Sequence, residues 1–212
     1  DRELELTVEA AWAAAALLVR DEVGAARQRL DRFVDLDGAT VGERRVLIQQ
    51  LCVAAETNRP AATIRRLAER VVGDWATPEQ FPETADWAWP RLLLTNIGEF
   101  DEVRRLCDAG VAHAQTQGSV VGLVTAAFVR GFTELHAGAL VDAERSFRQM
   151  LASAPGRGQR RSLLADTLGN GGLAQALALQ GRVDEATDVL ARLPRELPAH
   201  TPVNGAAMVW FG

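Results

Sequence analysis

Three short stretches decide the fold: GEFDEV at residues 98–103, GALVDA at 138–143 and GRVDEA at 181–186. Each starts with glycine, has an apolar residue two positions later, then an acidic residue, and ends on a small or apolar residue. The three glycines lie 40 and 43 residues apart in the numbering. Two weaker copies start at Asp21 and Asn58, residue types that also tolerate turns. Self-similarity at a fixed period is typical of a repeat architecture.

The signature has a direct physical interpretation as a turn between two helices. Glycine ends the first helix because it readily adopts the left-handed conformation. Acidic residues such as Asp101 and Asp184 suit the first turn of the second helix, near its free amide groups. Seven residues after the first apolar position, two helical turns later, an apolar residue recurs in every copy. We expect these residues to line one buried stripe: Leu30, Leu67, Cys107, Phe147 and Leu190.

A second apolar-periodic segment precedes each turn and completes a helical hairpin. These first helices are predicted at 6–19, 41–56, 82–97, 120–137 and 162–180. The sequence therefore predicts one all-α domain over 1–212, with five hairpins at 4–36, 41–73, 82–117, 119–154 and 159–194. A further helix is expected to start within 203–212, and the chain is expected to be a piece of a longer protein.

Two features interrupt the predicted first helices. Pro90 should kink or interrupt the third, because proline lacks the amide hydrogen that a helix interior needs. Gly169, Gly171 and Gly172 lie inside the fifth, where either a close helix contact or a break would explain them. Cys52 and Cys107 lie on apolar faces and are predicted to be buried structural thiols.

Composition excludes several classes of function. The formal net charge is −5, and no run of basic residues forms an arm that would grip nucleic acid. No stretch of about 18 apolar residues predicts a membrane span; Ala10 to Val19 is apolar but too short, and no basic region or cleavage site surrounds it. The sequence predicts a cytoplasmic protein that contacts neither nucleic acid nor membrane directly.

No constellation of residues predicts catalysis. All 23 basic residues are arginines, so a phosphate-binding loop, which needs lysine, is excluded in this segment. The Gly156-Arg157-Gly158 stretch with Arg160 and Arg161 could hold an anion, although a solvated loop is the better interpretation. No metal-binding or nucleophile motif occurs. We expect no enzyme activity, no metal and no cofactor in this segment.

Aromatic and polar residues provide the candidate binding site. Trp87 and Trp89 belong to a dense aromatic stretch that could floor a ligand pocket, or could simply pack between hairpins. In helical-hairpin arrays the first helices line the concave face. Counting back from each turn glycine places the other candidates near that face: Asn96, Phe128, Phe132, His136, Asn170 and Gln175.

The turn segments LQGRVDEA at 179–186 and LHAGALVDAE at 135–144 resemble tetratricopeptide-like repeats. Small residues at Gly131 and Ala174, seven positions before a turn glycine, add to the resemblance. The period near 40 residues and the lack of tyrosine are similar to the degenerate repeats of large ATP-dependent LuxR-type bacterial transcriptional regulators. This resemblance implies a right-handed superhelix, an α-solenoid of about five hairpins.

The resemblance also implies a function. In that family the repeat region senses a small-molecule or protein effector, while an ATPase module and a helix-turn-helix lie elsewhere in the chain. We expect this segment to bind an effector or partner in its concave groove and to contact adjacent domains of its own chain, with homo-oligomers possible. The alternative is a peptide-binding scaffold unrelated to transcription.

Overall fold

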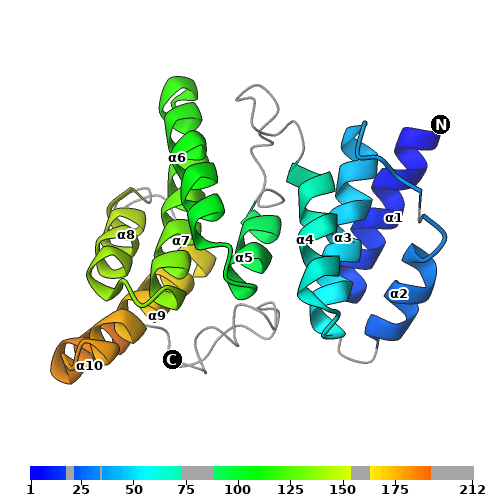
Figure 1. Ribbon diagram of the computed structural model, residues 1–212. Coiled ribbons are helices and arrows are strands. Elements are labelled where there is room, and N and C mark those ends of the chain that lie inside the picture. Colours follow the sequence, from blue (N-terminus) through cyan, green and yellow to red (C-terminus); the bar gives the residue numbers. More distant parts are fainter. Residues whose placement is uncertain (18–21, 34, 73–87, 154–162, 192–212) are drawn as a thin grey trace. The chain divides into compact units, whose positions relative to one another are not determined.

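The computed structural model describes residues 1–17, 22–33, 35–72, 88–153 and 163–191. This described part contains ten α-helices and no strand, which confirms the all-α prediction (Figure 1). None of these helices is both long and apolar enough to cross a membrane. In chain order the helices are α1 (Arg2–Ala16), α2 (Val23–Leu30), α3 (Val41–Glu56), α4 (Ala61–Val72), α5 (Ala88–Asn96), α6 (Phe100–Gln117), α7 (Val120–His136), α8 (Leu140–Ser153), α9 (Leu163–Leu179) and α10 (Val183–Leu190).

The predicted first helices correspond to the odd-numbered helices. The limits of α3 are those predicted, and α7 and α9 differ from prediction by at most one residue at each end. Helix α1 starts and ends earlier than predicted. Of the predicted helix at 82–97, residues 82–87 lie outside the described part, as does the expected helix start at 203–212.

The chain divides into two compact units, an N-terminal unit (Asp1–Ile97) and a C-terminal unit (Gly98–Gly212). In the N-terminal unit, α3 packs against α1, α2, α4 and α5. Its buried core includes Leu6, Val46, Leu47, Leu51 and Val71. In the C-terminal unit, α7 packs between α6 and α8, and α9 packs against α7, α8 and α10 (Figure 1).

The predicted turn chemistry is confirmed at four positions. Gly98, Gly138 and Gly181 have φ of 85°, 77° and 80°, and Asn58 takes the same left-handed conformation with φ of 51°. After three of these left-handed residues, and also after Gly118, the backbone amide of the following residue donates a hydrogen bond to the carbonyl oxygen five residues before it. This pattern is a Schellman motif. These bonds are Arg59 N–Ala54 O (2.9 Å), Ser119 N–Ala114 O (2.8 Å), Ala139 N–Glu134 O (2.8 Å) and Arg182 N–Leu177 O (3.0 Å).

The buried stripe of the second helices is offset from the prediction. Leu30, Cys107 and Phe147 are buried as predicted and Leu67 is half-buried, but Leu190 is 45% exposed. The prediction for Leu190 is therefore wrong. In four of these helices the first buried residue lies three positions after the first apolar residue of the repeat. These buried residues are Ala26, Val103, Ala143 and Ala186. In the short helix α10 this inward face is completed by Val189, which leaves Leu190 outside it.

The glycines of α9 make room for an aromatic ring. Helix α9 is continuous from Leu163 to Leu179, so a break is excluded. A Cβ atom at Gly172 would lie 2.3 Å from the ring of Phe147, and one at Gly131 would lie 2.9 Å from the same ring. Phe147 on α8 is thus inserted against the backbones of both α7 and α9. Close helix contact is the explanation for Gly172.

Pro90 lies in α5, which is described as Ala88–Asn96, and the predicted helix residues before Ala88 lie outside the described part, so the predicted kink stays a prediction. The two cysteines behave in part as predicted. Cys107 is buried as predicted, whereas Cys52 is only partly buried.

Candidate functional site

Seven of the eight predicted site residues are described, and they are spread over three helices of the two units. Trp87 and the anion-loop candidates at 156–161 lie outside the described residues. Trp89 is half-buried in α5 and Asn96 is exposed at the end of α5, both in the N-terminal unit. The remaining five residues lie on α7 and α9 of the C-terminal unit. Three of them, all on α7, are neighbours whose rings contact one another.

Phe128, Phe132 and His136 form a row of rings along α7, which we call the aromatic row. The ring centroids of Phe128 and Phe132 lie 6.3 Å apart, and those of Phe132 and His136 lie 4.1 Å apart. Exposure increases along the row, from the buried Phe128 through the half-buried Phe132 to the exposed His136. The row thus offers a ring surface at the carboxyl end of α7.

A backbone hydrogen bond fixes the orientation of His136. Its Nδ1 lies 2.9 Å from the carbonyl oxygen of Phe132. Because a carbonyl oxygen can only accept, Nδ1 carries the hydrogen. In the neutral ring, Nε2 is therefore the atom left to accept a hydrogen bond from a ligand.

Asn170 and Gln175 lie on α9, and both are half-buried. Five residues of α-helix turn by about 140°, so these two side chains point in different directions. They do not form one continuous polar surface.

The structure also contains a groove of about 620 Å³ on the C-terminal unit, which we call the α6–α8 groove. Helices α6 and α8 form its walls and α7 forms its floor. None of the seven predicted site residues that the structure describes lines it. Its lining residues are Arg104, Cys107, Asp108, Val111, Ala112 and Gln115 of α6, Ala126, Ala127, Arg130 and Glu134 of α7, Asp142, Arg145, Ser146 and Gln149 of α8, and Ala139 just before α8.

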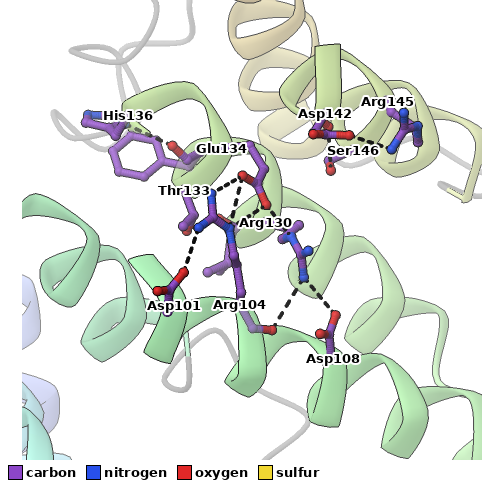
Figure 2. Close-up of polar contacts among 12 residues, drawn as sticks. Asp101, Arg104, Asp108, Arg130, Thr133, Glu134, His136, Asp142, Arg145 and Ser146 are labelled. Atoms are coloured by element: carbon purple, nitrogen blue, oxygen red, sulfur yellow. Dashed lines mark hydrogen bonds and ion pairs between the residues drawn. The ribbon is translucent and has the colours of Figure 1, made fainter. Parts of the chain in front are cut away.

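The groove and the aromatic row lie on opposite faces of α7. Ala126, Arg130 and Glu134 follow one another at four-residue spacing, as do the three rings, but the two series are out of step by two residues. Two residues of α-helix turn by about 200°, which separates the two faces. Figure 2 shows His136 pointing away from the charged cluster around Glu134.

Glu134 is the centre of that charged cluster, and its side chain is only 4% exposed. Arg104 donates to it through Nη2 at 2.7 Å and through Nε at 3.1 Å. Arg130 donates from Nε to Oε1 at 2.6 Å. The outer ends of the two arginines pair with Asp101 at 2.8 Å and Asp108 at 2.7 Å (Figure 2). One carboxylate thus joins α6 to α7.

The charges hold Glu134 ionised. Burial alone would raise the pKa of Glu134, but the hydrogen bonds and positive charges of Arg104 and Arg130 lower it below the ordinary value. The pKa of Arg104 is raised because it donates to Glu134 and Asp101, which outweighs its own desolvation. All three groups are therefore charged at neutral pH.

Two arginines keep unused donors toward the groove. Arg130 uses Nε and Nη1 in the bonds to protein, which leaves Nη2 without an acceptor among the described residues. Arg145 donates only from Nη1, to Asp142 at 2.6 Å. A guanidinium group carries five N–H donors in a fork that fits a carboxylate. The groove can therefore accept an acidic group.

Sequence reasoning missed this groove, although one signal was present. Arg130 and Glu134 stand four residues apart, the spacing of an ion pair on one helix face. The residues of α7 that were predicted as site residues lie on its aromatic face instead. Arg104 lies 30 residues from Glu134, and only the packing of α6 on α7 brings them together.

Among the described residues, no group of three or more His, Cys, Asp or Glu side chains could hold a metal ion. Comparison with protein-family models, with curated proteins and with solved structures found no match. The geometry of the two surfaces on α7 is therefore the basis for the proposals below.

Proposed function

We propose that this chain is the effector-binding or partner-binding repeat module of a bacterial transcriptional regulator of the ATP-dependent LuxR type. Its role is to hold a small-molecule or protein effector against the first helices of its hairpins. Binding there shifts the equilibrium between two states of the regulator by differential affinity. No cofactor, metal or catalytic step is part of this proposal.

A solenoid of tetratricopeptide-like hairpins is the architecture that we propose for it. Within each unit a helix packs on the next helix and on the next but one, as in α1–α2, α1–α3, α7–α8 and α7–α9. The left-handed turn residues recur at spacings of 40, 40 and 43 residues, from Asn58 to Gly181. Stacked hairpins with neighbour-only contacts are typical of α-solenoids.

The single observation that carries the function is the aromatic row on α7. The rings of Phe132 and His136 are in contact, with their centroids 4.1 Å apart and their planes tilted by 39°; Phe132 is half-buried and His136 is exposed. Exposed, oriented rings are suited to bury a ligand by stacking and to give it one directed hydrogen bond, here through Nε2 of His136. A row on a first helix is where a concave binding face would lie.

A thermal-shift screen against a metabolite library and candidate effector peptides tests the proposal. A ligand that binds only the folded chain raises the melting temperature in a saturable way. We expect Phe132→Ala and His136→Ala each to lower the affinity for that ligand by about tenfold. Each substitution removes about 1–2 kcal/mol of ring contact or hydrogen bonding. Titration by calorimetry measures the change.

Val141→Ala is the matched control, since Val141 is an apolar residue on α8 that is 63% exposed. It should leave both helicity and binding unchanged. If both ring variants bind the ligand as the wild type does, the aromatic row is not the site.

A peptide-binding scaffold independent of transcription is the second candidate, and the same aromatic row favours it equally. The intact gene separates the two. An ATPase module and a helix-turn-helix in the same chain support the regulator, and their absence leaves only the scaffold.

A further inference from the structure

We propose that the α6–α8 groove is a second interaction surface, distinct from the aromatic row, and that it binds an amphipathic α-helix of a protein partner. The partner helix presents small or apolar side chains to the floor of the groove and an acidic side chain to Arg130 and Arg145. This inference goes beyond the proposed function, because it concerns the opposite face of α7.

The dimensions of the groove fit three turns of helix. Along α6 its lining extends from Arg104 to Gln115, eleven helical steps or about 16 Å. Along α8 it extends from Asp142 to Gln149, seven helical steps or about 10 Å, so both walls are parts of helices. A helix of about eleven residues has the same length.

The floor and inner walls are built from small residues. Ala112, Ala126, Ala127 and Ala139 line the groove together with Val111. Ala126 and Ala127 are buried in the floor, so the apolar surface open to a partner comes from Val111, Ala112 and Ala139. Short side chains let a second backbone approach closely. The groove thus combines a narrow apolar strip with a charged rim.

The walls favour a helical occupant over an extended peptide. An extended peptide needs backbone partners for its own amides and carbonyls, as at a sheet edge. Here the walls are helices, whose backbone groups are already paired within the helix. A helical occupant satisfies its own backbone and needs only side-chain contacts.

The rim favours a macromolecular partner over a small molecule. Asp108 and Arg145 are 73% and 71% exposed, whereas a small-molecule pocket usually encloses most of its ligand. The groove lining carries three arginines and three acids, so it is formally neutral. A helix with charges of both signs complements such a surface.

Charge complementarity identifies the decisive contact. Arg130 Nη2, together with Nε and Nη2 of Arg145, has no acceptor among the described residues. Arg130 is held in place by Glu134 and Asp108, so it is preorganised for a ligand. The structure therefore points to a carboxylate on the partner as the group that these donors recognise.

Selection of displayed peptides against the intact chain tests the proposal. The probe is a library of helix-forming peptides of about 14 residues, and the affinity of each selected peptide is measured by fluorescence anisotropy. We expect the selected peptides to carry an acidic residue and to become helical on binding. Ala112→Trp, which fills the groove from an exposed position on α6, should lower the affinity for the selected peptides by at least about tenfold. Arg145→Glu should have a similar effect, since it places like charges opposite each other.

Two matched variants control for nonspecific effects. Arg105 resembles Arg145 closely: it is 73% exposed on α6 and pairs three residues away, with Glu102, but it does not line the groove. Ala152 is an exposed alanine of α8 outside the groove. Arg105→Glu and Ala152→Trp should keep the affinity within about twofold of wild type.

A charge swap gives the sharpest outcome. Replacing the acidic residue of the peptide by arginine should restore its binding to the Arg145→Glu variant. The proposal is overturned if no helical peptide is selected, if the swap restores nothing, or if the groove variants bind the peptides as wild type does. The variant Phe132→Ala should not change this affinity, so failure of the aromatic row as a site leaves the groove proposal standing.

Discussion

At the residue scale, one ring and two missing side chains organise the C-terminal unit. Phe147 is 1% exposed and lies against the backbones of α7 and α9, at Gly131 and Gly172. Interiors are packed as densely as organic crystals, so there is no spare volume for an added methyl group beside this ring. The glycines that weaken α9 as an isolated helix are those that allow it to pack.

Gly172→Ala should therefore destabilise the protein although alanine is the better helix former. The gain in helix propensity is at most about 1 kcal/mol, whereas crowding a packed core costs about 1–3 kcal/mol. The new Cβ would start only 2.3 Å from the ring, which places the cost near the upper end of that range, so the net loss should be about 2 kcal/mol. Urea unfolding measures it.

Gly24→Ala is the comparison for this substitution. Gly24 lies in α2, and a Cβ atom there would meet nothing within 4 Å. It should be neutral or stabilising by up to about 1 kcal/mol. Equal stabilisation by both substitutions would contradict the packing of Phe147, and Phe147→Leu should relieve part of the loss in the Gly172→Ala background.

At the element scale, the helices and their turns were predictable because their determinants are local. Asn58 and Gly138 end helices through their own backbone freedom, and short-range apolar spacing sets α3 between Val41 and Glu56. The exposure of Leu190 was not predictable, because a shift of one residue, to Val189, decides which face of α10 points inward. The α6–α8 groove was missed because Arg104 meets Glu134 only through the packing of two helices.

The same contact makes the junction of α6 and α7 sensitive to acid. The pKa of Glu134 is lower in the folded chain than in the unfolded chain, where it is about 4.3. The stability it contributes is therefore fully present above that pH and is lost as the pH falls through its folded pKa. Denaturant midpoints measured from pH 7 down to pH 3 report the loss.

Glu134→Gln should remove this part of the acid sensitivity. It leaves Arg104 and Arg130 close together without their shared carboxylate, which should cost about 1–3 kcal/mol at pH 7. That is less than for a fully buried pair, because both arginines are about a third exposed. The difference from wild type should shrink toward pH 3. Glu5→Gln, at an exposed pair with Arg2, is the control and should stay within about 0.5 kcal/mol. A difference that does not change with pH would contradict the role of the Glu134 charge.

At the scale of the whole molecule, the main contacts join helices that are one or two helices apart along the chain. These contacts divide the chain into two compact units. When each helix touches only near neighbours, stability is a sum of local contributions, and a defect need not spread through the molecule. The sequence period predicted such neighbour-only packing. The sequence period could not predict the boundary between the two units after Ile97, because every copy of the repeat carries similar turn residues.

Hydrogen exchange can test whether the two units respond separately. Leu51 of α3 and Leu177 of α9 are both fully buried, one in each unit. Truncating either leucine to alanine should cost about 2–5 kcal/mol. We expect Leu51→Ala to speed amide exchange in α1, α3 and α4 by about 30-fold or more, with little change in α8 and α9. Leu177→Ala should give the reverse pattern, since it perturbs the other unit. If each variant accelerated exchange equally in all helices, the chain would be opening as one cooperative unit. In that case, binding of the proposed effector on α7 would stabilise the N-terminal helices through folding cooperativity alone. Separate responses would mean that a specific contact is needed to transmit the effect of binding.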